Sequence, residues 1–194
     1  MKFKLMHGKL SKILKDSKEN SKENSKEIIF ILAPMLGMVG QASVAYFLQN
    51  AMDKKYIPII IGYCSPSVKK TNFSGIVLIL PWGSDYMGLR KLFYFVRIFK
   101  FIYLIWVLKP KFIICQGMTG IYFGIIGKLF HAKSKIIGSI HESANKYFND
   151  SSLNKKKLYF LRKLDAIHYV SHGIKNQYEK SIVISNSKVI YTPT

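Results

Sequence analysis

A histidine and a carboxylate stand together where an apolar segment ends. Residues 135–140 read Lys-Ile-Ile-Gly-Ser-Ile, and His141 and Glu142 follow directly. If the segment is a strand of a parallel sheet, both residues lie at the carboxyl edge, where open α/β sheets bind ligands. An imidazole there can hydrogen-bond a substrate or act as a base near neutral pH. We therefore take His141 as the candidate catalytic residue; the alternative is a loop histidine without a chemical role.

Two glycines form a second candidate site. Gly37 and Gly40 lie in the loop 34–40, between the apolar segment 28–33 and a helical pattern. Glycines there would let backbone amides approach a phosphate or a sugar hydroxyl, or would serve a tight turn and nothing more. A dinucleotide site needs G-x-G-x-x-G and an acidic residue after the second strand. The second candidate strand is followed by Tyr63-Cys64-Ser65 instead, which argues against NAD.

The remaining histidines and the cysteines are weaker candidates. His131 is expected to end a helix, His168 to lie inside a strand, and His172 to follow one. Cys64 and Cys115 have no metal-ligand spacing, and an apolar run surrounds Cys115. We expect both thiols to be reduced and inert, and we predict no metal site.

Short apolar segments rich in isoleucine alternate with helical patterns along the chain, and these are the elements that must position the candidates. This rhythm is typical of an α/β fold in which a doubly wound, Rossmann-like parallel sheet is covered on both faces. The predicted strands are 28–33, 58–62, 75–80, 111–115, 135–140, 166–171 and 188–192. The predicted helices are 41–52, 86–108, 118–131, 152–163 and 173–181.

The composition indicates one strongly basic domain. The chain has 194 residues, 49% of them hydrophobic, and a net charge of +20, which is enough for one core and suits a polyanionic partner. Residues 1–27 form a polar, flexible leader with eight of the 30 basic and four of the 10 acidic side chains, so residues 28–194 carry +16. Phosphate-bearing substrates or an anionic membrane could use this charge. Nucleic acid is not expected, because no recognition helix or RNA-binding aromatic strand is visible.

The segment 86–108 is rich in aromatic residues but is not a predicted membrane span. Arg97 and Lys100 interrupt its apolar run, which is too short without them. At helical spacing Arg90, Arg97 and Lys100 share one side with Tyr94. We expect the aromatic and aliphatic side to pack on the sheet and the basic side to meet anionic lipid. A helix that contacts only the core is the alternative.

Several stretches together resemble the N-terminal, acceptor-side half of a GT-B glycosyltransferase of the retaining family 4 type. The family's opening glycine loop resembles residues 28–41, with Gln41 close to the place of an acid. Its "leu-lys-pro-asp-val-ile-his" stretch resembles 104–116, with Gln116 near the usual histidine. The other matching stretches are 139–142, with the strand-end histidine, 164–171, which resembles "ala-asp-ala-ile-ile-ala-val-ser", and 189–194, which resembles the crossing to the second domain.

The resemblance implies sugar transfer from a nucleotide sugar to a glycan or lipid-linked acceptor, as in polysaccharide biosynthesis. His141 would contact the transferred sugar, and the implied substrate-binding residues are Gly37, Gly40, Gln41, Gln116, Glu142 and Ser171. The family's C-terminal domain, which binds the nucleotide diphosphate, has no counterpart in these 194 residues. We therefore expect a truncated chain, inactive alone, that needs a donor-binding domain or subunit. The expected location is cytoplasmic, peripheral at the inner face of the plasma membrane.

A non-catalytic role is the alternative hypothesis. A basic α/β module could dock on an anionic membrane or on a partner chain without transferring sugar.

Overall fold

The structure is a computed structural model, and it describes residues 26–33, 45, 48–52, 55–62, 76–80, 90–141, 157–180 and 186–190. Its strands are β1 (Glu27–Ala33), β2 (Tyr56–Gly62), β3 (Ile76–Ile79), β4 (Phe112–Gln116), β5 (Lys135–Ile140), β6 (Ala166–Tyr169) and β7 (Ser187–Val189). Its labelled helices are α3 (Arg90–Leu108), α4 (Gly117–Phe130) and α7 (His172–Glu179).

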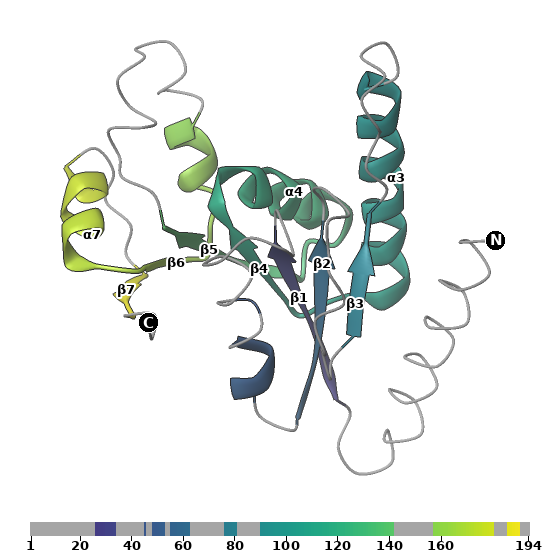
Figure 1. Ribbon diagram of the computed structural model, residues 1–194, viewed down its shortest axis with the longest axis horizontal. Coiled ribbons are helices and arrows are strands. Elements are labelled where there is room, and N and C mark those ends of the chain that lie inside the picture. Colours follow the sequence, from purple (N-terminus) through teal and green to yellow (C-terminus); the bar gives the residue numbers. More distant parts are fainter. Residues whose placement is uncertain are drawn as a thin grey trace.

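The strands form one parallel sheet in the order β3-β2-β1-β4-β5-β6-β7 (Figure 1). The chain adds strands outward from β1 to β3, crosses back, and then adds β4 to β7 on the other side. The order therefore reverses between β1 and β4. In open parallel sheets the crevice at the carboxyl ends of the strands beside such a switch point is where ligands bind.

The predicted α/β fold is confirmed, and each of the seven predicted strands overlaps an observed one. Predicted helix 86–108 begins at Arg90, and α4 begins one residue before its prediction and ends at Phe130, with His131 as its C-cap. The predicted helices 41–52 and 152–163 lie partly outside the described residues, but 48–51 and 157–161 are helical. The leader 1–27 lies almost entirely outside the described residues.

One face of the sheet is covered by α3, α4 and α7. The ring centroids of Phe30 on β1 and Phe101 on α3 are 6.4 Å apart. The Phe101 ring meets the Phe123 ring of α4 edge to face, with centroids 5.4 Å apart. On the other face Ile29 and Ile31 pack with Ala45 and Leu48 of the helical stretch before β2. Both faces of β1 are therefore buried, as the continuous apolar run 28–33 predicts.

Helix α4 lies very close to the sheet. A Cβ added at Gly124 would come within 2.4 Å of Cys115 Sγ and 3.0 Å of an Ile136 methyl carbon. Residues without a side chain on this side of α4 thus allow the helix to approach β4 and β5.

The orientation of α3 is the reverse of the expected one. Arg97, predicted to face outward, is buried with Phe101 and Leu104 on the side toward the core. Phe99 and Trp106, which belong to the aromatic side that was expected to pack on the sheet, are 70% and 68% exposed. The aliphatic residues Leu104, Ile105 and Leu108 decide the orientation, because their core contacts outweigh the preference of one arginine for water. Among the described helices none is both long and apolar enough to cross a bilayer.

Candidate functional site

Three of the predicted site residues lie at the carboxyl edge of the sheet. Gln116 is the last residue of β4 and is fully buried, and His141 follows β5 and is partly buried. Ser171 lies two residues after β6 ends. The other predicted site residues, Gly37, Gly40, Gln41 and Glu142, lie outside the described residues.

A row of polar residues crosses the sheet just inside this edge. Gln116 on β4 is the register partner of Ser139 on β5, and Ser139 is the partner of His168 on β6. Register partners in a parallel sheet point to the same face. Gln116 and Ser139 are both fully buried, so the row is a polar strip in an otherwise apolar sheet.

Hydrogen bonds connect His141 to the polar row. Ser139 Oγ lies 2.9 Å from His141 Nε2 and 2.8 Å from His168 Nδ1. His168 Nε2 lies 2.9 Å from the carbonyl oxygen of Ile190, just after β7. The rings of His141 and His168 are nearly perpendicular, at 87°, with centroids 6.4 Å apart. His141 is therefore held by a hydrogen-bonded chain that spans three strands.

Ser139 and His168 are the residues that sequence reasoning missed. The expected place of His168 inside a strand makes it a weaker candidate, and Ser139 is not among the predicted site residues. The available signal was a polar side chain near the carboxyl end of an apolar strand, as in Phe-Ile-Ile-Cys-Gln, Lys-Ile-Ile-Gly-Ser-Ile and Ala-Ile-His-Tyr. Such a residue must find a hydrogen-bond partner when it is buried.

Ser171 has a local structural role. It is the N-cap of α7, and its hydroxyl oxygen accepts a hydrogen bond of 3.2 Å from the backbone N–H of Ile174. A serine in this position satisfies one of the unpaired donors at the start of a helix. Substrate binding by Ser171 stays a prediction.

The junction between β4 and α4 brings a helix start to the switch point. Helix α4 begins directly after Gln116, without a loop, and Gly117 has a φ of 67°. A positive φ of this size favours glycine. Gln116 is the N-cap residue but makes no side-chain capping hydrogen bond. Peptide N–H groups at a helix start carry partial positive charge, which favours anions at this edge.

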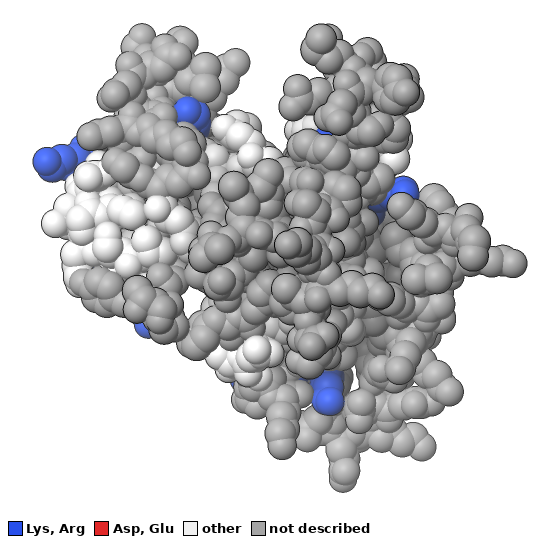
Figure 2. All heavy atoms as spheres, in the orientation of Figure 1, with Lys and Arg blue, Asp and Glu red and all other residues white. Residues whose placement is uncertain are grey.

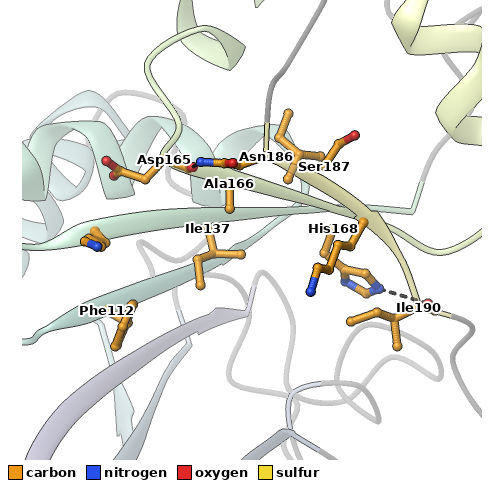
Figure 3. Close-up of a pocket in the computed structure, with 11 residues that line it drawn as sticks. Phe112, Ile137, Asp165, Ala166, His168, Asn186, Ser187 and Ile190 are labelled. Carbon is orange, nitrogen blue, oxygen red and sulfur yellow. Dashed lines mark hydrogen bonds between the residues drawn. The ribbon is translucent and has the colours of Figure 1, made fainter.

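A cavity of about 600 Å³ lies on the face of the sheet that carries the polar row (Figure 3). Phe112, Ile137 and Ala166 form its floor, and His168 and Ile190 line one end with their hydrogen bond visible. The cavity therefore opens onto one end of the hydrogen-bonded chain described above.

Asp165 stabilises the opposite, amino-terminal edge of the sheet. Its carboxylate accepts hydrogen bonds from Lys128 Nζ at 2.7 and 2.8 Å and from the backbone N–H of Ile136 at 2.7 Å. Desolvation by burial acts to raise the pKa of Asp165, but these hydrogen bonds and the charges of Lys128 and Lys135 lower it overall. The ionised carboxylate thus connects α4, β5 and the start of β6.

Neither thiol chemistry nor a bound metal has a basis in the described residues. Burial raises the pKa of the Cys115 thiol, which keeps it protonated and unreactive, as its apolar context predicts. Cys64 lies outside the described residues. Within the parts of the chain that the structure describes, no group of three His, Cys, Asp or Glu side chains could hold a metal ion.

The described surface is basic. On the face shown in Figure 2, Lys and Arg side chains are visible among the described residues, and no acidic side chain of a described residue is visible there. This agrees with the net charge of +20 for the whole chain.

Solved structures share this fold at low sequence identity. The apo form of the lipopolysaccharide outer core galactosyltransferase WaaB matches with a TM-score of 0.64 and 16% identity, over 87% of this chain and 46% of that one. HepE of Anabaena, in complex with UDP and glucose, matches with a TM-score of 0.66 and 12% identity, over 86% and 44%. The UDP-GlcNAc 2-epimerase of Methanocaldococcus jannaschii matches with a TM-score of 0.54 and 13% identity, over 84% and 45%.

These likenesses define the class of fold. The chain has the Rossmann-like domain fold found in GT-B enzymes, and it spans less than half the length of the solved structures named above. The same fold occurs in a galactosyltransferase and in an epimerase, so it does not by itself decide the reaction. No protein-family model matches the sequence, and neither does any curated protein.

Proposed function

We propose that residues 28–194 are the acceptor-side half of a glycosyltransferase that moves a sugar from a nucleotide sugar to a glycan or a lipid-linked acceptor. The observation that carries the proposal is the position of His141 at the carboxyl edge of the sheet. HepE shares this fold, and its structure was determined in complex with UDP and glucose. Because the chain spans less than half of HepE, donor binding would require a second domain or subunit. The retaining, family 4 type is the form of transfer that the sequence motifs favour.

The proposed roles follow from position at the edge. His141 contacts the transferred sugar, and Gln116 lies beside the switch point, where the acceptor or donor phosphate approaches the start of α4. Gly37, Gly40, Gln41 and Glu142 would complete the substrate contacts from their loops. Ser171 would contribute only if a ligand approaches the start of α7.

The first experiment measures the intact mass of the endogenous product and reads the coding frame beyond Thr194. A product about twice this size, or a copurifying donor-binding subunit, supports the proposal and supplies the complete enzyme. A product of 194 residues with no such subunit contradicts it.

The second experiment tests the chemistry in that complete enzyme. Purified protein is given a panel of nucleotide sugars, and both sugar transfer and sugar epimerisation are followed. The proposal expects transfer, which His141→Ala lowers at least about tenfold while the matched variant His131→Ala, at the opposite edge, retains it. Epimerisation without transfer, or full transfer by His141→Ala, would refute the corresponding assignment.

We further propose that α3 docks on an anionic membrane, with the aromatic rather than the basic side in contact. Phe95, Phe99 and Trp106 recur at helical spacing and are between 57% and 70% exposed. Aromatic residues are favoured at the interface between lipid head groups and chains, and the positive charge of the protein complements anionic lipid. Lys109, directly after the helix, is exposed and adds a positive charge at this end of α3.

Vesicle sedimentation tests this surface. We expect binding to vesicles that contain phosphatidylglycerol, weaker binding to phosphatidylcholine alone, and partial release by high salt. Phe99→Ser and Trp106→Ser together should reduce binding about tenfold or more, whereas Tyr159→Ser removes a 56% exposed aromatic residue elsewhere and should not. Unchanged binding by the double variant would rule out α3 as the docking surface. Vesicle binding by a complete protein that transfers no sugar would favour the non-catalytic module.

A further inference from the structure

The carbonyl oxygen of Ile190 determines the direction of the hydrogen-bonded chain that ends at His141. A carbonyl oxygen accepts hydrogen bonds and cannot donate them, so His168 Nε2, 2.9 Å away, must carry the proton. In a neutral imidazole the other nitrogen then has a lone pair, and His168 Nδ1 accepts from the Ser139 hydroxyl at 2.8 Å. Because Ser139 has donated its hydrogen, its oxygen accepts from His141 Nε2 at 2.9 Å.

We propose that Ser139 and His168 are positioning residues that hold His141 as the Nε2–H tautomer, with the lone pair on Nδ1. In a functional histidine, the protonation of one ring nitrogen is set by the hydrogen bond that the other ring nitrogen makes. Neither positioning residue needs to touch substrate. The tautomer of His141 does not depend on the proposed function, and only its consequence for sugar binding rests on that function.

The strands make this arrangement rigid. Ser139 and His141 are two residues apart, so they point to the same face, and Ser139 is the register partner of His168. Ser139 is fully buried, so bulk water does not compete for its hydroxyl. The hydrogen bond to Ser139 therefore ties the orientation of the His141 ring to the sheet.

The tautomer has a chemical consequence. A group that hydrogen-bonds to His141 Nδ1 must itself be a donor, as a sugar hydroxyl is. In the proposed glycosyltransferase His141 would thus accept a hydrogen bond from the transferred sugar. The opposite polarity becomes available if Ile190 moves away, because His168 could then carry its proton on Nδ1 and donate a hydrogen bond to Ser139, whose hydroxyl would donate to His141 Nε2. His168 and Ile190 line the cavity of Figure 3, so a group that fills the cavity can affect His141 from there.

Nitrogen-15 NMR of the imidazole rings in the 194-residue chain tests the proposal without any substrate. At about pH 8.5, above the ordinary titration range of imidazole, protonated and lone-pair nitrogens have well-separated shifts. We expect Nε2–H for both His141 and His168. The signals are assigned with single His→Gln variants at positions 131, 141, 168 and 172.

Two variants then break the chain at different points. Ser139→Ala should leave His168 bonded to Ile190 and shift the nitrogen signals of His141 away from their wild-type values, and Ser139→Thr should restore them. His168→Phe should also shift the nitrogen signals of His141, because hydrogen bonds connect the two imidazoles through Ser139. Ser134→Ala is the matched control: Ser134 donates to the carbonyl of Pro110 and pairs with His131 Nδ1, so it should change His131 alone.

An Nδ1–H tautomer of His141, or a His141 spectrum unchanged in both Ser139→Ala and His168→Phe, would overturn the proposal. In the complete enzyme, His168→Phe should lower kcat more than it raises KM. If the wild-type enzyme transfers no sugar while the tautomers are as expected, the proposed function fails and the positioning role stands.

Discussion

Ser139 Oγ lies 2.8 Å from His168 Nδ1, and the two residues are register partners on β5 and β6. A shift of one residue between these strands would place the serine and the histidine on opposite faces. The hydrogen bond therefore exists only in the observed register, and it favours that register over its neighbours. The same contact that orients His141 also aligns the two strands that deliver it.

We expect Gly124→Ala to destabilise the protein by about 1–3 kcal/mol, although alanine favours helices over glycine by about 1 kcal/mol. The added methyl group would lie 2.4 Å from Cys115 Sγ, and the Cys115 side chain is fully buried. Thermal or urea unfolding measures the difference. Cys115→Ala in the same chain should recover part of the loss, and Gly173→Ala, with its nearest atom at 3.9 Å, should be neutral or stabilising. Additive effects of the 115 and 124 substitutions would contradict the contact.

Gly117→Ala should cost about 1–2 kcal/mol for a different reason. The φ of 67° at Gly117 lies in the left-handed region, where a Cβ atom clashes with the backbone. Gly117→Asn should cost less, because asparagine tolerates this conformation. Equal losses for the two variants in urea unfolding would show that lack of space, rather than φ, limits the position.

The stability provided by Asp165 should depend on pH. Its folded pKa is lowered, so its contribution is present above the unfolded pKa of about 3.9 and is lost as the pH falls through the folded value. Asp165→Asn should be less stable by about 1–3 kcal/mol at neutral pH, and the gap should narrow below about pH 4. Glu27→Gln, which removes an exposed pair with Lys111, should cost about 1 kcal/mol or less. A gap for Asp165→Asn that stays constant down to pH 2 would contradict this account.

Tyr169 should make the protein sensitive to alkali. Desolvation by burial, with a smaller contribution from Glu179, raises the pKa of its phenol to about 12. A raised folded pKa means that stability is intact below the unfolded value of about 10 and is lost as the pH rises toward the folded value. Among the described residues its hydroxyl has no hydrogen-bond partner, so Tyr169→Phe should be neutral or stabilising at pH 7. Above about pH 10 the variant should gain further on the wild type, whereas the exposed-site variant Tyr159→Phe should not.

Much of the fold could be predicted from local patterns. The run 28–33 is continuous and apolar, as a strand buried on both faces must be, and the run 135–140 is rich in isoleucine. The polar or glycine-containing breaks after them mark their ends. Helix α3 could be located but not oriented. Its two sides are both rich in apolar residues, so periodicity alone does not say which side meets the core.

The candidate site could be predicted only in part. His141 could be predicted because it follows a strand, and Gln116 because its stretch resembles a motif of the GT-B family. Ser139 and His168 were missed, although both are visible as polar residues in apolar strands. Their partnership depends on β5 and β6 being neighbours in register, and no local pattern states which strands are neighbours.

The sequence by itself determined the alternation of strands and helices, the parallel sheet and the edge at which His141 lies, because these depend on the periodicity of side chains along the chain. Only the tertiary structure decided which side of α3 is exposed and which residues hold His141. Both depend on contacts between segments far apart in the chain, such as Ser139 with His168 and His168 with Ile190. Packing selects those contacts from many that the sequence allows, because burial and hydrogen bonding must be satisfied for the whole sheet at once.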